Sequence, residues 1–116
     1  MVPDMSKPAT RSYSRFAREA TELLGHLIHC ERVEKGLTIT EVAERAGISR
    51  GLLQRIERGD MGCSIGVVFE VASILGIPLF TAEPASLTPH LALVRDKVAL
   101  LPQAVRQSRQ PLKDEF

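Results

Sequence analysis

The 116-residue sequence is poor in the residues that build aromatic cores, disulfide scaffolds and metal sites. It contains no tryptophan, one tyrosine and four phenylalanines, so its core must be mainly aliphatic. Its two cysteines, Cys30 and Cys63, lie 33 positions apart and form neither a CxxC motif nor a Cys–His pair. Such usage argues against a zinc site or a disulfide scaffold and suits a reducing compartment. We therefore expect a cytoplasmic protein that needs no cofactor.

The sequence also lacks the patterns of membrane segments, secretory signals and common catalytic motifs. Its apolar runs are short and interrupted, unlike a membrane span. Residues 1–12 contain no apolar segment of the kind that a secretory signal needs. No segment resembles a nucleophile elbow, and His26, His29 and His90 do not have the spacing of metal ligands. These features favour neither a membrane protein nor an enzyme.

The charge of the chain is informative through its position rather than its sum. Fifteen lysines and arginines oppose 14 aspartates and glutamates, which gives a net charge of +1. This total does not favour a nucleic acid as partner, but binding depends on where the charges lie. Between Arg45 and Gly59, four arginines accompany a single glutamate, a local balance of +3. One short segment is therefore strongly basic.

The first regular element predicted by the sequence is a long helix. Residues 1–12 contain two prolines among small and polar residues, which predicts a disordered N-terminal arm. Apolar residues then recur at helical spacing from about Ser14 to Lys35, where Gly36 is a natural end. Gly25 lies in the middle and weakens this helix by about 1 kcal/mol relative to alanine.

Three shorter helices follow, each with a start and a stop signal. Thr38 and Glu41 form a capping-box pattern for the second helix. Ser49 and Ser64 are predicted to cap the third and the fourth. Glycines end all three, at Gly47, Gly59 and Gly76. The fourth helix is apolar on nearly every side, which is typical of a helix buried in a core or in a subunit interface.

The remaining residues predict a linker, a further helix and a tail. We assign residues 13–81 to the main domain and 82–87 to the linker. Thr88 and Pro89 start a helix over 88–102, and residues 103–116 form a polar, flexible tail. Since no segment alternates strictly enough for a confident strand, the sequence predicts an all-α fold, a compact bundle of about five helices.

The second and third helices have the pattern of a helix-turn-helix. Val42 and Ala43 supply the inner face of the first member, and Leu53 and Ile56 that of the second. Gly47 permits the turn between them. The opposite face of the third helix then carries Arg50, Gly51, Gln54, Arg55 and Arg58. Arginine and glutamine side chains suit phosphates and base edges, and so does the N-terminus of a helix.

These residues belong to a longer stretch, "RVEKGLTITEVAERAGISRGLLQRIERGDMGCSIGVVFEVASILGI". It resembles the lambda-repressor/Xre family of helix-turn-helix DNA-binding domains, and the similarity covers about Leu23 to Phe80. The resemblance implies a compact bundle of about five helices that binds a double-stranded DNA operator as a homodimer. It also implies that Arg32 and Glu57 form a structural pair between the first and third helices.

The resemblance assigns roles to single positions of the helix from Ser49 to Arg58. The family's usual base-contacting positions fall on Arg50, Gly51, Leu52 and Gln54. We expect base specificity to depend on Arg50 and Gln54, and phosphate contacts to come from Arg55 and Arg58. Ile39 occupies a position often filled by glutamine, so Thr38 or Thr40 is expected to supply a phosphate contact instead. Leu52 also departs from the family's pattern, because a polar residue is often found there; it touches a thymine methyl or simply packs.

The rest of the chain indicates protein partners. The apolar faces of the fourth and fifth helices exceed the needs of a minimal domain and favour a second copy as partner. The ending "LLPQAVRQSRQPLKDEF" is similar to tails of HipB-type antitoxins, which implies a HipA-like kinase toxin as a further partner. The sequence thus predicts an autoregulatory repressor, with an antitoxin role. A stand-alone phage- or restriction-type regulator, a protein-interaction module that has lost DNA binding and a repressor gated by a small molecule are the alternatives.

Overall fold

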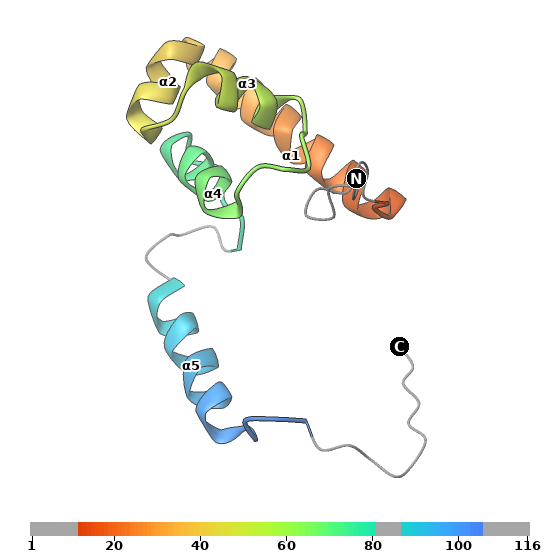
Figure 1. Cartoon of the computed structure of the whole chain (residues 1–116). Helices are drawn as coiled ribbons and strands as arrows, with labels where there is room; N and C mark the ends of the chain where they lie inside the picture. Colours follow the sequence, from red (N-terminus) through yellow and green to blue (C-terminus); the bar gives the residue numbers. More distant parts are fainter. Residues whose placement is uncertain (1–11, 81–86, 106–116) are drawn as a thin grey trace, which may run out of the picture. The chain divides into compact units, whose positions relative to one another are not determined.

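The computed structural model describes residues 12–80 and 87–105, and every regular element in these ranges is a helix (Figure 1). In chain order the helices are α1 (Arg15–Glu34), α2 (Ile39–Ala46), α3 (Arg50–Glu57), α4 (Ile65–Ile74) and α5 (Leu87–Leu100). The prediction of an all-α fold with about five helices is confirmed. The predicted arm, linker and tail lie largely outside the described residues.

The starts of the first three helices follow from their capping side chains. The hydroxyls of Ser14 and Ser49 each accept a hydrogen bond from the amide three residues later, at 3.1 and 3.0 Å. Thr38 and Glu41 form both bonds of the predicted capping box. Ser64 stands at the predicted N-cap position of α4, but its side chain makes no capping hydrogen bond. Local sequence therefore determines where α1 to α3 begin.

The helices α1 to α4 surround one core and are drawn together in Figure 1. Helix α1 packs on α3, while α2 packs on both α3 and α4. The buried cluster is entirely aliphatic, as the scarcity of aromatic residues predicts, and its members are Ile28, Val42, Ala43, Leu53, Ile56, Val71 and Leu75. Each helix thus contributes at least one fully buried side chain to the same small core.

At Gly25 the backbones of α1 and α3 lie close together. A β-carbon at Gly25 would lie 2.6 Å from the Ile56 carbonyl oxygen and 2.8 Å from that of Glu57. Gly59, which follows α3, also lies close to α1, because a β-carbon at this position would be 2.8 Å from Cα of Glu22. The sequence shows Gly25 only as a weak point in a helix, whereas the structure shows that the packing requires the missing side chain.

Burial of α4 is uneven along its length. Val71, Ala72 and Leu75 are completely buried, but Ile65 in the first turn is 71% exposed. Within one chain, the predicted burial of α4 is therefore confined to one side of its second half, where Glu70 and Ser73 remain exposed.

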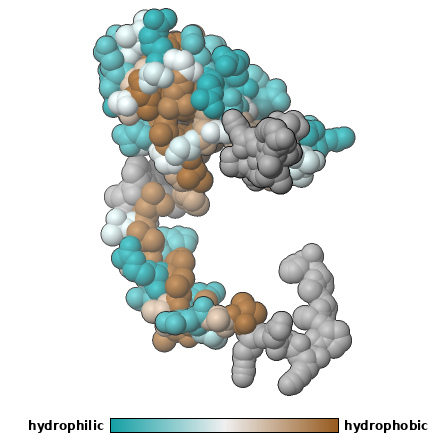
Figure 2. Space-filling model, in the orientation of Figure 1, coloured by the Kyte–Doolittle hydropathy of each residue, from teal (hydrophilic) through white to brown (hydrophobic). Residues whose placement is uncertain are grey.

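Helix α5 belongs to a separate unit of the chain, which begins at Phe80. It starts at Leu87 and ends at Leu100, so both ends lie before the predicted bounds of 88 and 102. Pro89 is still in the first turn, where its missing N–H costs no helical hydrogen bond. None of its residues is buried, and hydrophobic surface extends along much of the helix in Figure 2.

Candidate nucleic-acid interface

A tight turn fixes the direction of α3 relative to α2. Gly47 adopts a φ of 71°, in the left-handed region that favours glycine. The amide of Ile48 then donates to the carbonyl oxygen of Ala43 at 3.0 Å. Ser49 follows as the N-cap of α3. The two helices are thus joined by a defined connection of three residues, and the N-terminus of α3 is held at the surface.

Helix α3 presents one face to the core and the other to solvent. Leu53 and Ile56 are buried, whereas Arg50, Gln54 and Arg58 are exposed. These three polar residues are spaced four positions apart, so they line one side of the helix. The structure therefore brings three of the predicted DNA-contacting residues together in a single stripe.

The N-terminal end of this stripe suits an anion. Arg50 is the first residue of α3, where unpaired backbone N–H groups and the positive end of the helix dipole lie. Gly51 beside it is exposed and has no side chain to keep a ligand from the backbone. Ser49 uses an oxygen lone pair to accept the capping bond, and its hydroxyl proton stays available for donation.

The first turn of α2 supplies two further hydroxyls. Thr38 and Thr40 are both exposed. Thr38 accepts a hydrogen bond from the Glu41 amide at 3.0 Å and keeps its hydroxyl proton for donation. The Glu41 carboxylate is engaged by the Thr38 amide at 2.8 Å. An acidic side chain at this position is thus tied into the cap.

The two residues that depart from the family's pattern have a structural role. Ile39 and Leu52 are partly buried and pack against the aliphatic core. An apolar side chain at each position therefore extends the core toward the surface of α2 and α3. Leu52 keeps only part of its surface for contact with another molecule.

Arg55 is held by an acidic neighbour that the sequence interpretation missed. Its Nε donates to an oxygen of Asp60 at 3.0 Å, and the other oxygen of Asp60 accepts from the Gly62 amide at 2.7 Å. These hydrogen bonds hold the pKa of Asp60 below its usual value, so the carboxylate is ionised. Arg55 is thus oriented by Asp60, and its positive charge is balanced locally.

A buried ion pair anchors α3 to α1, as the family resemblance implies. Nε of Arg32 donates to one carboxylate oxygen of Glu57 at 2.6 Å, and Nη2 donates to the other at 3.1 Å. The Arg32 guanidinium also donates to the Leu37 carbonyl oxygen at 2.9 Å. Since both side chains are nearly buried, with 10% and 8% of their surface exposed, the pair positions α3 rather than contacting a ligand.

His29 completes this anchor. Its Nδ1 lies 2.8 Å from the Glu57 carboxylate. Burial alone would raise the pKa of Glu57, but the hydrogen bonds from Arg32 and His29 outweigh it and hold that pKa below its usual value. The sequence gives no sign of this contact, because His29 and Glu57 are 28 positions apart.

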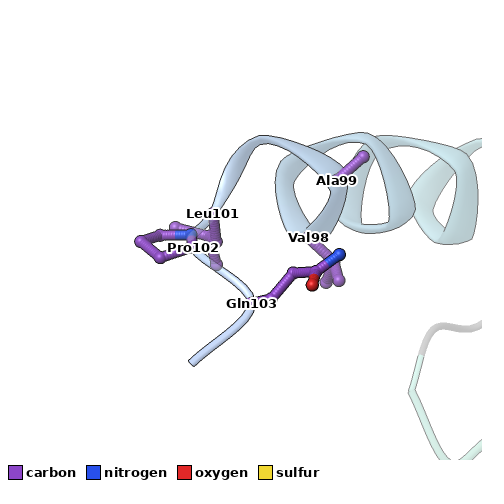
Figure 3. Close-up of a pocket in the computed structure, with 5 residues that line it drawn as sticks. All are labelled: Val98, Ala99, Leu101, Pro102 and Gln103. Atoms are coloured by element: carbon purple, nitrogen blue, oxygen red, sulfur yellow. The ribbon is translucent and has the colours of Figure 1, made fainter. Parts of the chain in front are cut away.

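The described residues offer little to other kinds of chemistry. They contain no cluster of three or more histidine, cysteine or acidic side chains that would hold a metal ion. Within the same ranges, no helix is both long and apolar enough to cross a membrane. Burial raises the pKa of the Cys63 thiol, which disfavours its reactive thiolate. A surface hollow at the end of α5 is lined by Val98, Ala99, Leu101, Pro102 and Gln103, none of them ionisable (Figure 3).

Comparison with known proteins agrees with this geometry. Residues 31–81 match the helix-turn-helix family. The matched segment is less than half of the chain and supports its resemblance to helix-turn-helix DNA-binding domains. One similar protein is the HTH-type transcriptional regulator SutR of Escherichia coli (strain K12), which is 30% identical over 62 residues. That alignment covers 52% of this chain and 35% of SutR, so the chain spans about a third of its relative's length.

The family match includes every residue of the stripe and of the turn. Helices α2, α3 and α4 lie wholly within residues 31–81, as does the Arg32–Glu57 anchor. Most of α1 and the whole of α5 lie outside it. The matched segment therefore contains the whole candidate interface, whereas most of α1 and all of α5 need a separate explanation.

Proposed function

We propose that this protein is a sequence-specific DNA-binding repressor of transcription. The observation that supports this function best is the register of α3. Arg50, Gln54 and Arg58 line its solvent side, while Leu53, Ile56 and Glu57 tie its other side to the bundle. A rigid helix that presents its N-terminal end and a basic stripe at the surface suits the major groove of DNA.

Two side chains of the stripe select bases in this proposal. Arg50 donates two hydrogen bonds to a guanine, and Gln54 pairs with the hydrogen-bonding edge of an adenine. Gly51 allows the backbone to approach the groove closely, because it has no side chain. The exposed part of Leu52 contacts a thymine methyl group. Base preference therefore depends most on Arg50 and Gln54.

The remaining predicted residues bind the phosphate backbone. Arg58 at the end of α3 is exposed and neutralises one phosphate. Arg55 also binds a phosphate. Its hydrogen bond to Asp60 balances part of its positive charge and limits the motion of its side chain. The hydroxyl groups of Thr38, Thr40 and Ser49 donate further hydrogen bonds to phosphates. Binding of these cations releases counterions from DNA, so affinity should fall steeply with salt.

The proposed repressor acts as a homodimer in the cytoplasm and catalyses no reaction. A two-fold dimer places two copies of α3 in successive major grooves, with half-sites about 34 Å apart. A single helix-turn-helix domain buries too little surface for tight and specific binding, whereas two joined domains add their contacts. The operator is therefore expected to be a short inverted repeat.

A finer proposal makes this repressor an antitoxin that regulates its own operon. The support is the similarity of the C-terminal segment to tails of HipB-type antitoxins, most of which lies outside the described residues. A HipA-like kinase would then bind that segment. Co-purification of the full chain with the product of the adjacent gene tests this role, and a phage or restriction gene at that place would favour the stand-alone regulator.

The rival interaction module rests on Ile39 and Leu52, whose apolar side chains replace polar ones. Both pack against the core, so neither position requires that DNA binding has been lost. We therefore favour the repressor.

Binding of the full chain to DNA from upstream of its own gene, measured at two salt concentrations, tests the proposed function. We expect the specific complex to survive an excess of unrelated DNA, and its affinity to fall with salt. Arg58→Ala should reduce the salt dependence by about one phosphate contact and leave the preferred sequence unchanged. Equal affinity for upstream and unrelated DNA would contradict sequence-specific repression.

A further inference from the structure

Two exposed stripes of apolar residues remain outside the core of the bundle, and they share one spacing. On α1 the stripe, here called the α1 seam, consists of Phe16, Ala20, Leu23, Leu27 and Cys30, all exposed. The corresponding α5 seam consists of Leu87, Leu91, Val94 and Val98 on α5 and of Leu101, which directly follows its last residue; all five are exposed. Both follow intervals of four, three, four and three residues, which is the heptad spacing of helices that pack side by side.

Neither seam has an explanation within the helix-turn-helix bundle. The residues of α1 that enter the bundle are Gly25, Ile28 and Arg32, all in its second half. The first ten residues of α1 have no buried side chain, and this end of the helix extends past its neighbours in Figure 1. Helix α5 has 14 residues and none that is buried, a length at which an isolated helix is only marginally stable. Both helices therefore need a packing partner.

The charges beside each seam differ in sign. In the heptad frame the positions that flank the α1 seam include Glu19 and Glu31. The flanking positions of the α5 seam include Arg95 and Lys97. Charges at these positions determine which helices pair and in which orientation. Opposite charges therefore favour a pair of α1 with α5, whereas two α5 helices have only basic side chains at these positions and gain no such attraction.

The orientation also follows from these positions. In a parallel pair that aligns Phe16 with Leu87, all five layers of the two seams meet. The same alignment places Glu19 opposite Arg95 and Glu31 opposite Lys97. An antiparallel pair aligns only four layers and one pair of opposite charges, Glu19 with Lys97. Glu31 already bonds to Lys35 at 2.9 Å in its own helix, but this pair is exposed and leaves the carboxylate able to accept a second donor.

We propose that α5 of one copy packs in parallel on α1 of a second copy, so that two chains exchange their α5 helices. The exchange is reciprocal and closes with two-fold symmetry, because each chain offers one α1 seam and one α5 seam. Each of the two contacts in the dimer buries one α1 seam and one α5 seam. Leu93 and Leu100, which are also exposed on α5, lie outside the seam. The inference locates the dimer interface that the proposed function requires, and it can be tested without DNA.

Two charge-reversed chains provide the test. The first carries Glu19→Lys and Glu31→Lys, and the second carries Arg95→Glu and Lys97→Glu. Each chain alone sets like charges against each other in both seams of a dimer. A dimer that contains one chain of each variant restores opposite charges at both contacts. The basic α5 of the first variant packs on the acidic α1 of the second, and the acidic α5 of the second packs on the basic α1 of the first. All four positions lie outside the core; Glu19, Arg95 and Lys97 are exposed and Glu31 is partly exposed.

The mass in solution of the full chain is measured by light scattering at one concentration, with circular dichroism as a check on folding. We expect the wild-type 12.8 kDa chain to give about twice its mass. Each reversed pair weakens association about threefold, and four pairs weaken it by roughly two orders of magnitude. Each variant alone should therefore be a monomer, and the mixture a dimer. A monomeric wild type, variants that remain dimers, or a mixture that stays monomeric would each overturn the proposal.

Crosslinking tests the orientation. In the parallel register the native Cys30 meets Leu101 of the second copy, so Leu101→Cys in a Cys63→Ser chain should form an interchain disulfide under mild oxidation. Leu91→Cys is the matched control, because its parallel partner is Ala20, about 15 Å along α1 from Cys30. A disulfide with Leu91→Cys and none with Leu101→Cys would contradict the parallel pair. Arg50→Ala, which impairs DNA binding in the proposed function, should leave mass and crosslink unchanged.

Discussion

Each of the helices α1 to α4 contributes apolar side chains to one core, whereas all apolar side chains of α5 remain exposed within a single chain. Leu53 in α3 has no exposed surface, and Leu93 in α5 is 70% exposed. Helix α5 contains a larger proportion of apolar residues than α3, but only α3 packs its apolar residues into a core in its own chain. Most helical stability comes from such packing rather than from local preference. The bundle is therefore expected to fold by itself, and α5 to depend on a partner.

The largest difference between the two regions should appear when one leucine is shortened in each. Leu53→Ala leaves a cavity in the core and should lower the free energy of unfolding by about 2–5 kcal/mol. Leu93→Ala removes an exposed side chain outside the α5 seam and should change the free energy of unfolding by less than about 0.5 kcal/mol. Urea denaturation measures both. Equal losses would show that α5 is as well packed as α3.

The next largest effect concerns the anchor between α1 and α3. Glu57→Gln leaves the buried Arg32 without its anionic partner and should cost about 3 kcal/mol. The matched exposed acid on α5 is Asp96, and Asp96→Asn should change stability little. Denaturant unfolding of the two variants gives the comparison. A Glu57→Gln chain as stable as the wild type would contradict the anchor.

The anchor also predicts a pH dependence. The pKa of Glu57 is lower in the folded chain than its ordinary value of about 4.3. Its contribution to stability is therefore complete above that ordinary value and is lost as the pH falls below it toward the folded pKa. Thermal unfolding between pH 7 and pH 3 should show a loss that is smaller in Glu57→Gln.

Replacing a glycine by alanine should have a smaller effect on stability, and its sign should depend on whether the helix surface is packed or open. Gly25→Ala puts a β-carbon 2.6 Å from a backbone oxygen and should destabilise the bundle by about 1–3 kcal/mol. At Gly51 the nearest atom to such a β-carbon is 4.0 Å away, so Gly51→Ala should stabilise α3 by up to about 1 kcal/mol. Stabilisation by both substitutions would show that α1 and α3 are not in close contact.

Local signals in the sequence predict much of this fold. Serine and threonine caps locate the starts of α1 to α3, and the spacing of Val42, Leu53 and Ile56 identifies the core face of the helix-turn-helix. These features depend on residues within one or two helical turns. The exposed stripe of α3 follows from the same register, since residues opposite a buried face must point to solvent.

Contacts between distant residues could not be predicted in this way. The bond between His29 and Glu57 joins positions 28 apart, and the bond between Arg55 and Asp60 crosses the end of a helix at a spacing that no helical rule covers. Gly25 shows the same limit of local rules. Its cost to α1 is visible in the sequence, but its benefit depends on the position of α3. Whether side chains bind DNA depends on a partner and is decided by experiment.

The most direct test of the central claim is selection of binding sites from random DNA by the full chain and by Arg50→Ala. The account predicts that the wild type enriches an inverted repeat. Arg50→Ala should lose preference at one base pair of each half-site and bind the original site about 1–3 kcal/mol more weakly. Selection of the same sequence with the same affinity by both chains would contradict the assignment of α3 as the recognition helix.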